Sequence, residues 1–164
     1  MDKRSLILLG LVAVLALALG AVVVYKAWPL LHPGIAQVAP LDPSCDLRRG
    51  PCTSSLPNRP ARIRFAVEPR SLPAAQPLRL SVSIEGVDAS EVAVDFAGVD
   101  MNMGFNRAAL EQVAPGRFEG GGMLPVCVRS RMTWEARVLA RTADGLVAAP
   151  FRFDTVSASA LPAD

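Results

Sequence analysis

Histidine is nearly absent from this chain of 164 residues, which contains a single copy, His32. Catalysis by a histidine base, and metal binding by paired histidines, therefore lack their main residue. The sequence also contains no nucleophile elbow and no phosphate-binding glycine loop. His32 itself stands in a proline-rich segment, where we expect it to be exposed. We predict that the protein is not an enzyme.

Neither sign of charge is in large excess, because 17 basic residues are balanced by 15 acidic ones and the net charge is +2. No run of like charge occurs, and the arginines alternate with apolar residues. A nucleic-acid partner needs a clustered basic face. We therefore expect no nucleic-acid binding.

Charge is missing altogether from Ser5 to Tyr25. A helix of these 21 residues, at about 1.5 Å per residue, would extend about 31 Å, enough to cross the hydrocarbon core of a bilayer. A cleaved signal peptide is the alternative, but its apolar core is normally shorter. We predict a transmembrane helix over residues 5–25 that anchors the protein in the bilayer. Because Lys3 and Arg4 precede this helix, residues 1–4 are expected to stay cytoplasmic.

Cysteine is also scarce, with three copies. Cys45 and Cys52 stand in a short Pro/Gly-rich segment, PSCDLRRGPC, which favours a local disulfide between them. A disulfide implies an oxidising compartment. Together with the charge bias, this pair predicts a single-pass protein of the bacterial inner membrane with its C-terminal domain in the periplasm. Cys127 would then be a free thiol, unless it pairs with Cys45 or Cys52 instead.

Proline divides the remaining chain, with seven prolines between residues 26 and 60. Prolines at this spacing exclude a helix or a central strand, so we expect residues 26–60 to form an extended linker that contains the cysteine pair.

A two-residue period begins at Ala61 and indicates half-buried antiparallel strands. The positions expected to face the core are Ile63, Phe65, Val67, Leu78, Leu80, Val82, Ile84, Val92, Val94, Phe96, Met132, Trp134, Ala136, Val138 and Ala140. Six or seven such strands over about a hundred residues predict an all-β fold, an immunoglobulin-like antiparallel β-sandwich over residues 61–156. Residues 157–164 are expected to be a flexible tail.

Sulfur is concentrated in one part of this domain. Met101, Met103, Met123, Cys127 and Met132 lie within a short stretch, and the M-x-M pair falls where a loop is expected. Soft thioether and thiolate ligands suit Cu(I). Packing is the alternative, because methionine fills irregular gaps in small cores and sulfur packs well against aromatic rings such as that of Trp134. The sequence leaves both interpretations open.

This layout, an N-terminal anchor, a β-sandwich, an M-x-M loop and a later methionine and cysteine cluster, resembles the membrane-anchored copper-handling accessory proteins of bacterial respiratory-oxidase assembly. The resemblance rests on the same five sulfur residues. The chain departs from that family in lacking the histidines that many members use, and it lacks the closely spaced cysteine motif of thioredoxin-like copper chaperones.

The resemblance implies a non-enzymatic, membrane-tethered periplasmic domain that binds or passes Cu(I) to a membrane or periplasmic protein partner. The alternative is an immunoglobulin-like structural or interaction module of a cell-envelope complex that binds no metal.

Overall fold

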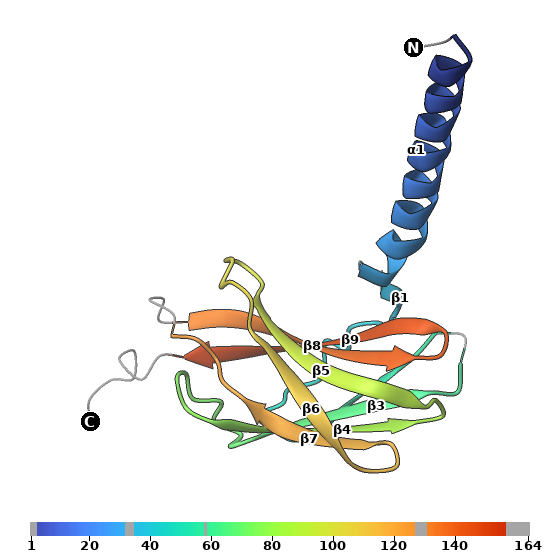
Figure 1. Ribbon diagram of the computed structural model, residues 1–164. Helices are drawn as coiled ribbons and strands as arrows, with labels where there is room; N and C mark the ends of the chain where they lie inside the picture. Colours follow the sequence, from blue (N-terminus) through green and yellow to red (C-terminus); the bar gives the residue numbers. More distant parts are fainter. Residues whose placement is uncertain (1–2, 32–34, 58, 127–130, 157–164) are drawn as a thin grey trace. The chain divides into compact units, whose positions relative to one another are not determined.

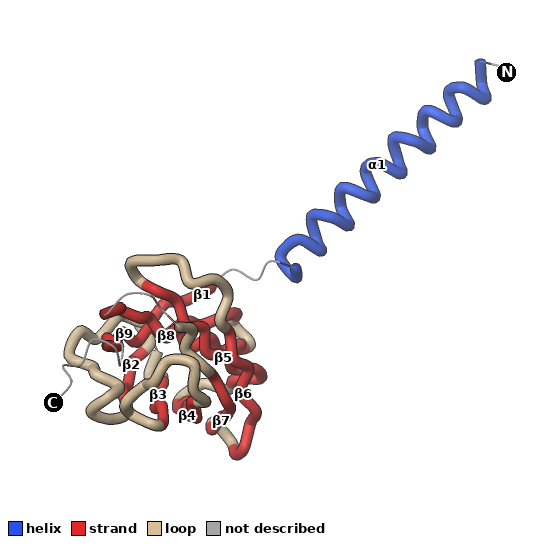
Figure 2. Tube along the Cα trace, turned by 90° about the vertical axis from the view of Figure 1, so that its left-hand side faces the viewer, coloured by secondary structure: helices blue, strands red, loops and turns tan. Residues whose placement is uncertain are grey.

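The computed structural model describes residues 3–31, 35–57, 59–126 and 131–156, and within its helix it describes the side chains of residues 4–5 and 10–26 (Figure 1). The chain divides into two units, Met1–Gly34 and Ile35–Asp164. The first unit contains the helix and the second contains the strands (Figure 2).

Helix α1 covers Lys3–Leu31 and contains the whole uncharged run from Ser5 to Tyr25. Leucine, alanine and valine make up most of this run, and a continuous helix satisfies its backbone hydrogen bonds within the segment. Within the described part of the chain, no helix combines the length and the apolar character that a membrane crossing requires.

The second unit is one curled sheet of nine strands. Their bounds are β1 (Ile35–Val38), β2 (Cys52–Ser55), β3 (Arg62–Glu68), β4 (Leu78–Glu85), β5 (Ala89–Gly98), β6 (Arg107–Ala114), β7 (Arg117–Gly122), β8 (Arg131–Thr142) and β9 (Gly145–Val156). The order across the sheet is β1-β9-β8-β5-β6-β7-β4-β3-β2. The pair β1–β9 is parallel, and the other neighbouring strands are antiparallel.

Side-chain alternation explains how this sheet forms a core. Each apolar position that the two-residue period assigned to the core is buried, including Phe65 in β3 and Trp134 in β8. Phe65 lies against Phe151 of β9, with ring centroids 5.5 Å apart, although β3 and β9 stand near opposite ends of the strand order. The sheet therefore curls around a common apolar interior, and the all-β prediction is confirmed.

Strand β6 joins the two halves of the curled sheet. Its first part, Arg107 to Leu110, pairs with β5, whereas its second part, Glu111 to Ala114, pairs with β7. Figure 1 shows β6 and β7 diverging from the turn that they share. The change of partner leaves the first part of β6 unpaired with β7, although Ala109 and Leu110 still lie close to Gly120.

The sequence predicts an extended linker over residues 26–60, but the structure departs from this prediction after residue 34. Strands β1 and β2 lie in it, and Ala39, Leu47 and Leu56 are buried in the core of the second unit. The prolines lie outside these two strands, each of which is only four residues long. Two short edge strands can therefore form between prolines that would break a longer element.

Candidate metal-binding site

The methionines that the structure describes in the second unit all lie near one end of the sheet. Met101 and Met103 stand in the connection from β5 to β6, Met123 follows the last residue of β7, and Met132 is the second residue of β8. Because β5 and β8 are antiparallel, the end of β5 meets the start of β8. Cys127 lies outside the described residues, so its predicted role as a ligand stays a prediction.

Two of the methionine side chains converge over Gly98, the last residue of β5. A Cβ atom added at Gly98 would lie 3.1 Å from Met103 Cγ and would be closer still to Met132 Cε. It would also collide with the backbone oxygen of Met101. Glycine at this position therefore leaves room for both Met103 and Met132 to approach the strand.

Hydrogen bonds hold the connection between β5 and β6 in place. Asn102 Oδ1 accepts a bond of 2.9 Å from the N–H of Gly104, and Asn106 Nδ2 donates one of 2.9 Å to the Met103 carbonyl. Gly104 adopts a φ of 77°, a conformation that glycine takes without steric cost. Both amides close turns around Met103, so this methionine stands on an ordered backbone.

Burial differs among these side chains. Met132 is 4% exposed and belongs to the core, while Met101 and Met103 are partly buried and pack against it. A cavity of about 400 Å³ lies beside the connection and is lined by residues 97–104. Met101 and Met103 therefore pack against the core and also line this cavity.

Met123 lines a different cavity, of about 460 Å³, together with Phe105. Its side chain is 55% exposed. The structure thus brings Met103 and Met132 together beside Met101, and it does not place Met123 among the residues of their cavity.

Trp134, the aromatic ring that the packing interpretation placed against methionine sulfur, is 1% exposed. Its indole Nε1 donates a hydrogen bond of 3.0 Å to Thr155 Oγ1. Gly98 is its cross-strand partner in β5, so the ring stands beside the methionine pair on the core face. The tryptophan is therefore buried on the same face of β8 as Met132.

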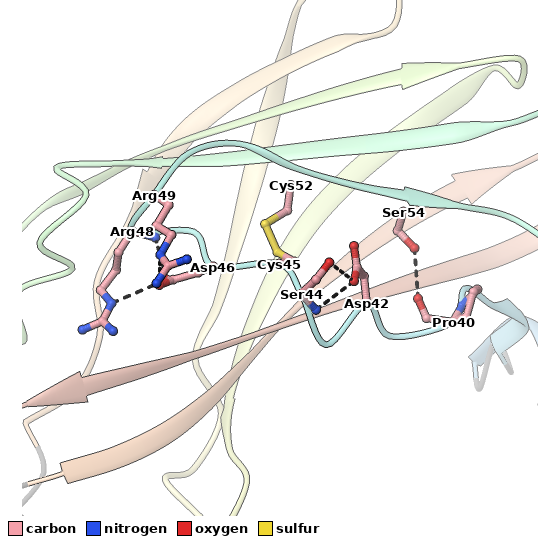
Figure 3. Close-up of a disulfide and its surroundings, with 9 residues drawn as sticks. All are labelled: Pro40, Asp42, Ser44, Cys45, Asp46, Arg48, Arg49, Cys52 and Ser54. Atoms are coloured by element: carbon pink, nitrogen blue, oxygen red, sulfur yellow. Dashed lines mark hydrogen bonds and ion pairs between the residues drawn. A yellow bond between two sulfur atoms is a disulfide. The ribbon is translucent and has the colours of Figure 1, made fainter.

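The predicted disulfide between Cys45 and Cys52 is present, with Cα atoms 5.7 Å apart (Figure 3). The turn before it is held by Asp42, whose carboxylate accepts hydrogen bonds from the hydroxyl and the N–H of Ser44. These bonds lower the pKa of Asp42 from its ordinary value. Within the described chain, no three histidine, cysteine, aspartate or glutamate side chains are close enough to hold a metal ion together.

Sequence reasoning missed Gly98 and Asn106. The role of Gly98 depends on how β5 and β8 align, and one sequence does not reveal that alignment. For Asn106 the sequence did contain a weak indication, since asparagine commonly closes turns through its side chain.

No protein-family model matches the chain, and no curated protein matches it. The crystal structure of an engineered protein is similar over part of its length, at 17% sequence identity and a TM-score of 0.39. The match covers 56% of this chain and 20% of the engineered one. A similarity at this level supports no conclusion about the fold of this chain or the role of any residue.

Proposed function

We propose that this protein is a non-enzymatic, membrane-tethered domain that binds or passes Cu(I) for the assembly of a metalloenzyme such as a respiratory oxidase. The observation that carries this proposal is the convergence of Met103 and Met132 over Gly98, beside Met101. The proposed ligands are the thioethers of Met101, Met103 and Met132.

Thioether chemistry favours Cu(I) over harder cations. Methionine sulfur is a soft ligand, whereas Mg²⁺, Ca²⁺ and Mn²⁺ prefer oxygen ligands. A thioether also carries no proton that a metal must displace, so binding does not depend on deprotonating it. A site built from such ligands can release Cu(I) to a partner that offers thiolates.

The tether in this proposal is helix α1, and its support is the uncharged sequence from Ser5 to Tyr25 with Lys3 and Arg4 before it. In this proposal the strand-rich unit lies in the periplasm, anchored to the bacterial inner membrane. Such a location agrees with the disulfide between Cys45 and Cys52, because disulfides persist in oxidising compartments. A tether would raise the effective concentration of the domain near a membrane partner.

The proposal also includes an immunoglobulin-like sandwich as the fold of the second unit. Two groups of neighbouring strands support it. The run β3-β4-β7-β6 follows the order A-B-E-D of one immunoglobulin sheet, and the run β5-β8-β9 follows the order C-F-G of the other.

Protection of methionine from oxidation tests the metal site directly. The full chain in detergent micelles is treated with hydrogen peroxide in chloride-free buffer, with and without Ag(I), a redox-inert substitute for Cu(I). Mass spectrometry then measures the sulfoxide at each methionine. Ag(I) should slow the oxidation of Met101 and Met103 and leave Met123, the internal control, unchanged. Equal oxidation of Met101 and Met103 with and without Ag(I) would refute the site.

A further inference from the structure

The end of β7 is formed by three successive glycines, Gly120 to Gly122. On one side these residues pair with Leu78 to Leu80 of β4. On the other side, pairing with β6 stops at Glu119 within the described chain, because β6 has turned away to pair with β5. The far edge of β7 therefore has no strand beside it at Gly121 and Gly122 among the described residues.

A cavity of about 460 Å³ opens where β6 and β7 separate. Gly121 and Gly122 line it from β7, and Phe105 and Met123 flank it from the two adjoining connections. Phe105 is 77% exposed and Met123 is 55% exposed, so two large apolar side chains are open to solvent at the mouth of this cavity. We call this region the β6–β7 cleft.

The β6–β7 cleft continues into a second cavity of about 820 Å³, because Pro77 and Gly121 line both. A Cβ atom added at Gly121 would meet no heavy atom within 4 Å, so open space lies directly above this residue. Glycine inside a strand commonly marks a place where another backbone approaches closely. The two cavities together form a continuous path along the glycine edge.

Basic side chains predominate along this path. Arg70 and Arg79 line the larger cavity with Glu68, and Arg107 lines the smaller one. The guanidinium of Arg107 lies 4.9 Å from the centre of the Phe105 ring and forms an ion pair of 3.6 Å with Asp95. No ion pair is found for Arg70 or Arg79 among the described residues. The path therefore combines an apolar mouth with an excess of positive charge.

We propose that the β6–β7 cleft binds an extended, acidic segment of a partner protein by strand addition to the edge of β7. In such binding, backbone hydrogen bonds supply affinity and alternate side chains supply specificity. An apolar side chain of the segment would lie between Phe105 and Met123. The acidic side chains on either side of this apolar residue in the segment would face Arg79 and Arg107. This proposal involves no methionine-bound metal and stands without it.

Three synthetic peptides test the proposal on the full chain in detergent micelles. The first alternates valine or leucine with glutamate, the second has lysine in place of each glutamate, and the third is the acidic peptide with alternate backbone amides methylated. Fluorescence anisotropy measures binding of each labelled peptide. The acidic peptide should bind with a Kd below about 1 mM, and at least about tenfold more tightly than either of the others.

Two glycine variants locate the binding site. Gly121→Val places a side chain in open space on the face of Arg79, its cross-strand partner, and should weaken binding of the acidic peptide by at least about tenfold. Gly50→Val is the matched control, because a Cβ atom at Gly50 also meets nothing within 4 Å and this residue lies outside the cleft. No binding of the acidic peptide, equal binding of all three peptides, or equal effects of the two variants would each overturn the proposal.

Discussion

Single residues decide whether the methionines can act together. Sequence position alone placed Met101 and Met103 in a loop and Met132 in a strand, and it gave no reason for contact between them. The two side chains converge because Gly98 has no side chain at the point where Met103 and Met132 approach it. The alignment of β5 with β8 sets this geometry, so the spacing of residues along the chain did not predict it.

Gly98→Ala should disturb this arrangement. The added Cβ would collide with Met132 Cε and with the backbone oxygen of Met101, so the loop must shift. We expect a loss of about 1–3 kcal/mol in the free energy of unfolding, as for other overpacked sites, and weaker Cu(I) binding. Gly121→Ala is the control, since its Cβ would meet nothing within 4 Å. Urea unfolding and Cu(I) titration of both variants measure the effects, and equal behaviour of the two would contradict this interpretation.

Glu135 of β8 makes the free energy of unfolding depend on pH, because its pKa is shifted in the folded state. Burial raises its pKa, but hydrogen bonds and charges from Arg137, at 2.7 Å, and Arg152, at 3.0 Å, outweigh burial and leave the pKa below its ordinary value. A carboxylate with a lowered pKa stabilises the folded state fully above its unfolded pKa, and this contribution is lost as the pH falls through the folded pKa.

Glu135→Gln removes that dependence. We expect the difference in unfolding free energy between the wild type and this variant to be largest near pH 7 and to shrink as the pH falls below the ordinary glutamate pKa. Urea unfolding at a series of pH values measures it. A difference that stays constant, or grows in acid, would rule out the ion-pair explanation.

Among the strands, those with a regular alternation of buried and exposed side chains could be predicted from the sequence. Strands β3, β4 and β8 are of this kind. Strand β6 gives little periodic signal in the sequence, because its change of partner interrupts the alternation and leaves Val113 exposed. Strands β1 and β2 were missed, since four-residue edge strands between prolines give almost no periodic signal.

The disulfide joins Cys45, in the connection between β1 and β2, to Cys52, the first residue of β2, and it should stabilise the folded state. Replacing Cys45 and Cys52 with serine removes the constraint on the unfolded chain, so the free energy of unfolding should fall by about 2 kcal/mol. Urea unfolding of the double variant, compared with the oxidised wild type, measures the change. Equal stability of the two proteins would show that the bond contributes nothing to folding.

At the scale of the whole molecule, we propose a membrane anchor, helix α1, followed by a ligand-binding domain, the second unit. If Ser5 to Tyr25 spans the membrane, the full-length protein expressed in bacteria should stay in the membrane fraction after carbonate extraction. A soluble periplasmic form that begins near Ala21 would instead identify the segment as a cleaved signal peptide.

The central claim is that methionine thioethers hold Cu(I), and titration of the full chain against a competing Cu(I) chelator tests it most directly. Met101→Leu combined with Met103→Leu nearly conserves volume and hydrophobicity, so stability should change by less than about 1.5 kcal/mol per site. Met123→Leu is the control, because Met123 lines a different cavity.

The wild type and the control should bind Cu(I), and binding should persist in mild acid because thioethers have no proton to lose. The double variant should lose at least about tenfold in affinity. A wild type that fails to compete with the chelator, or a double variant that binds as tightly as the wild type, would contradict the claim.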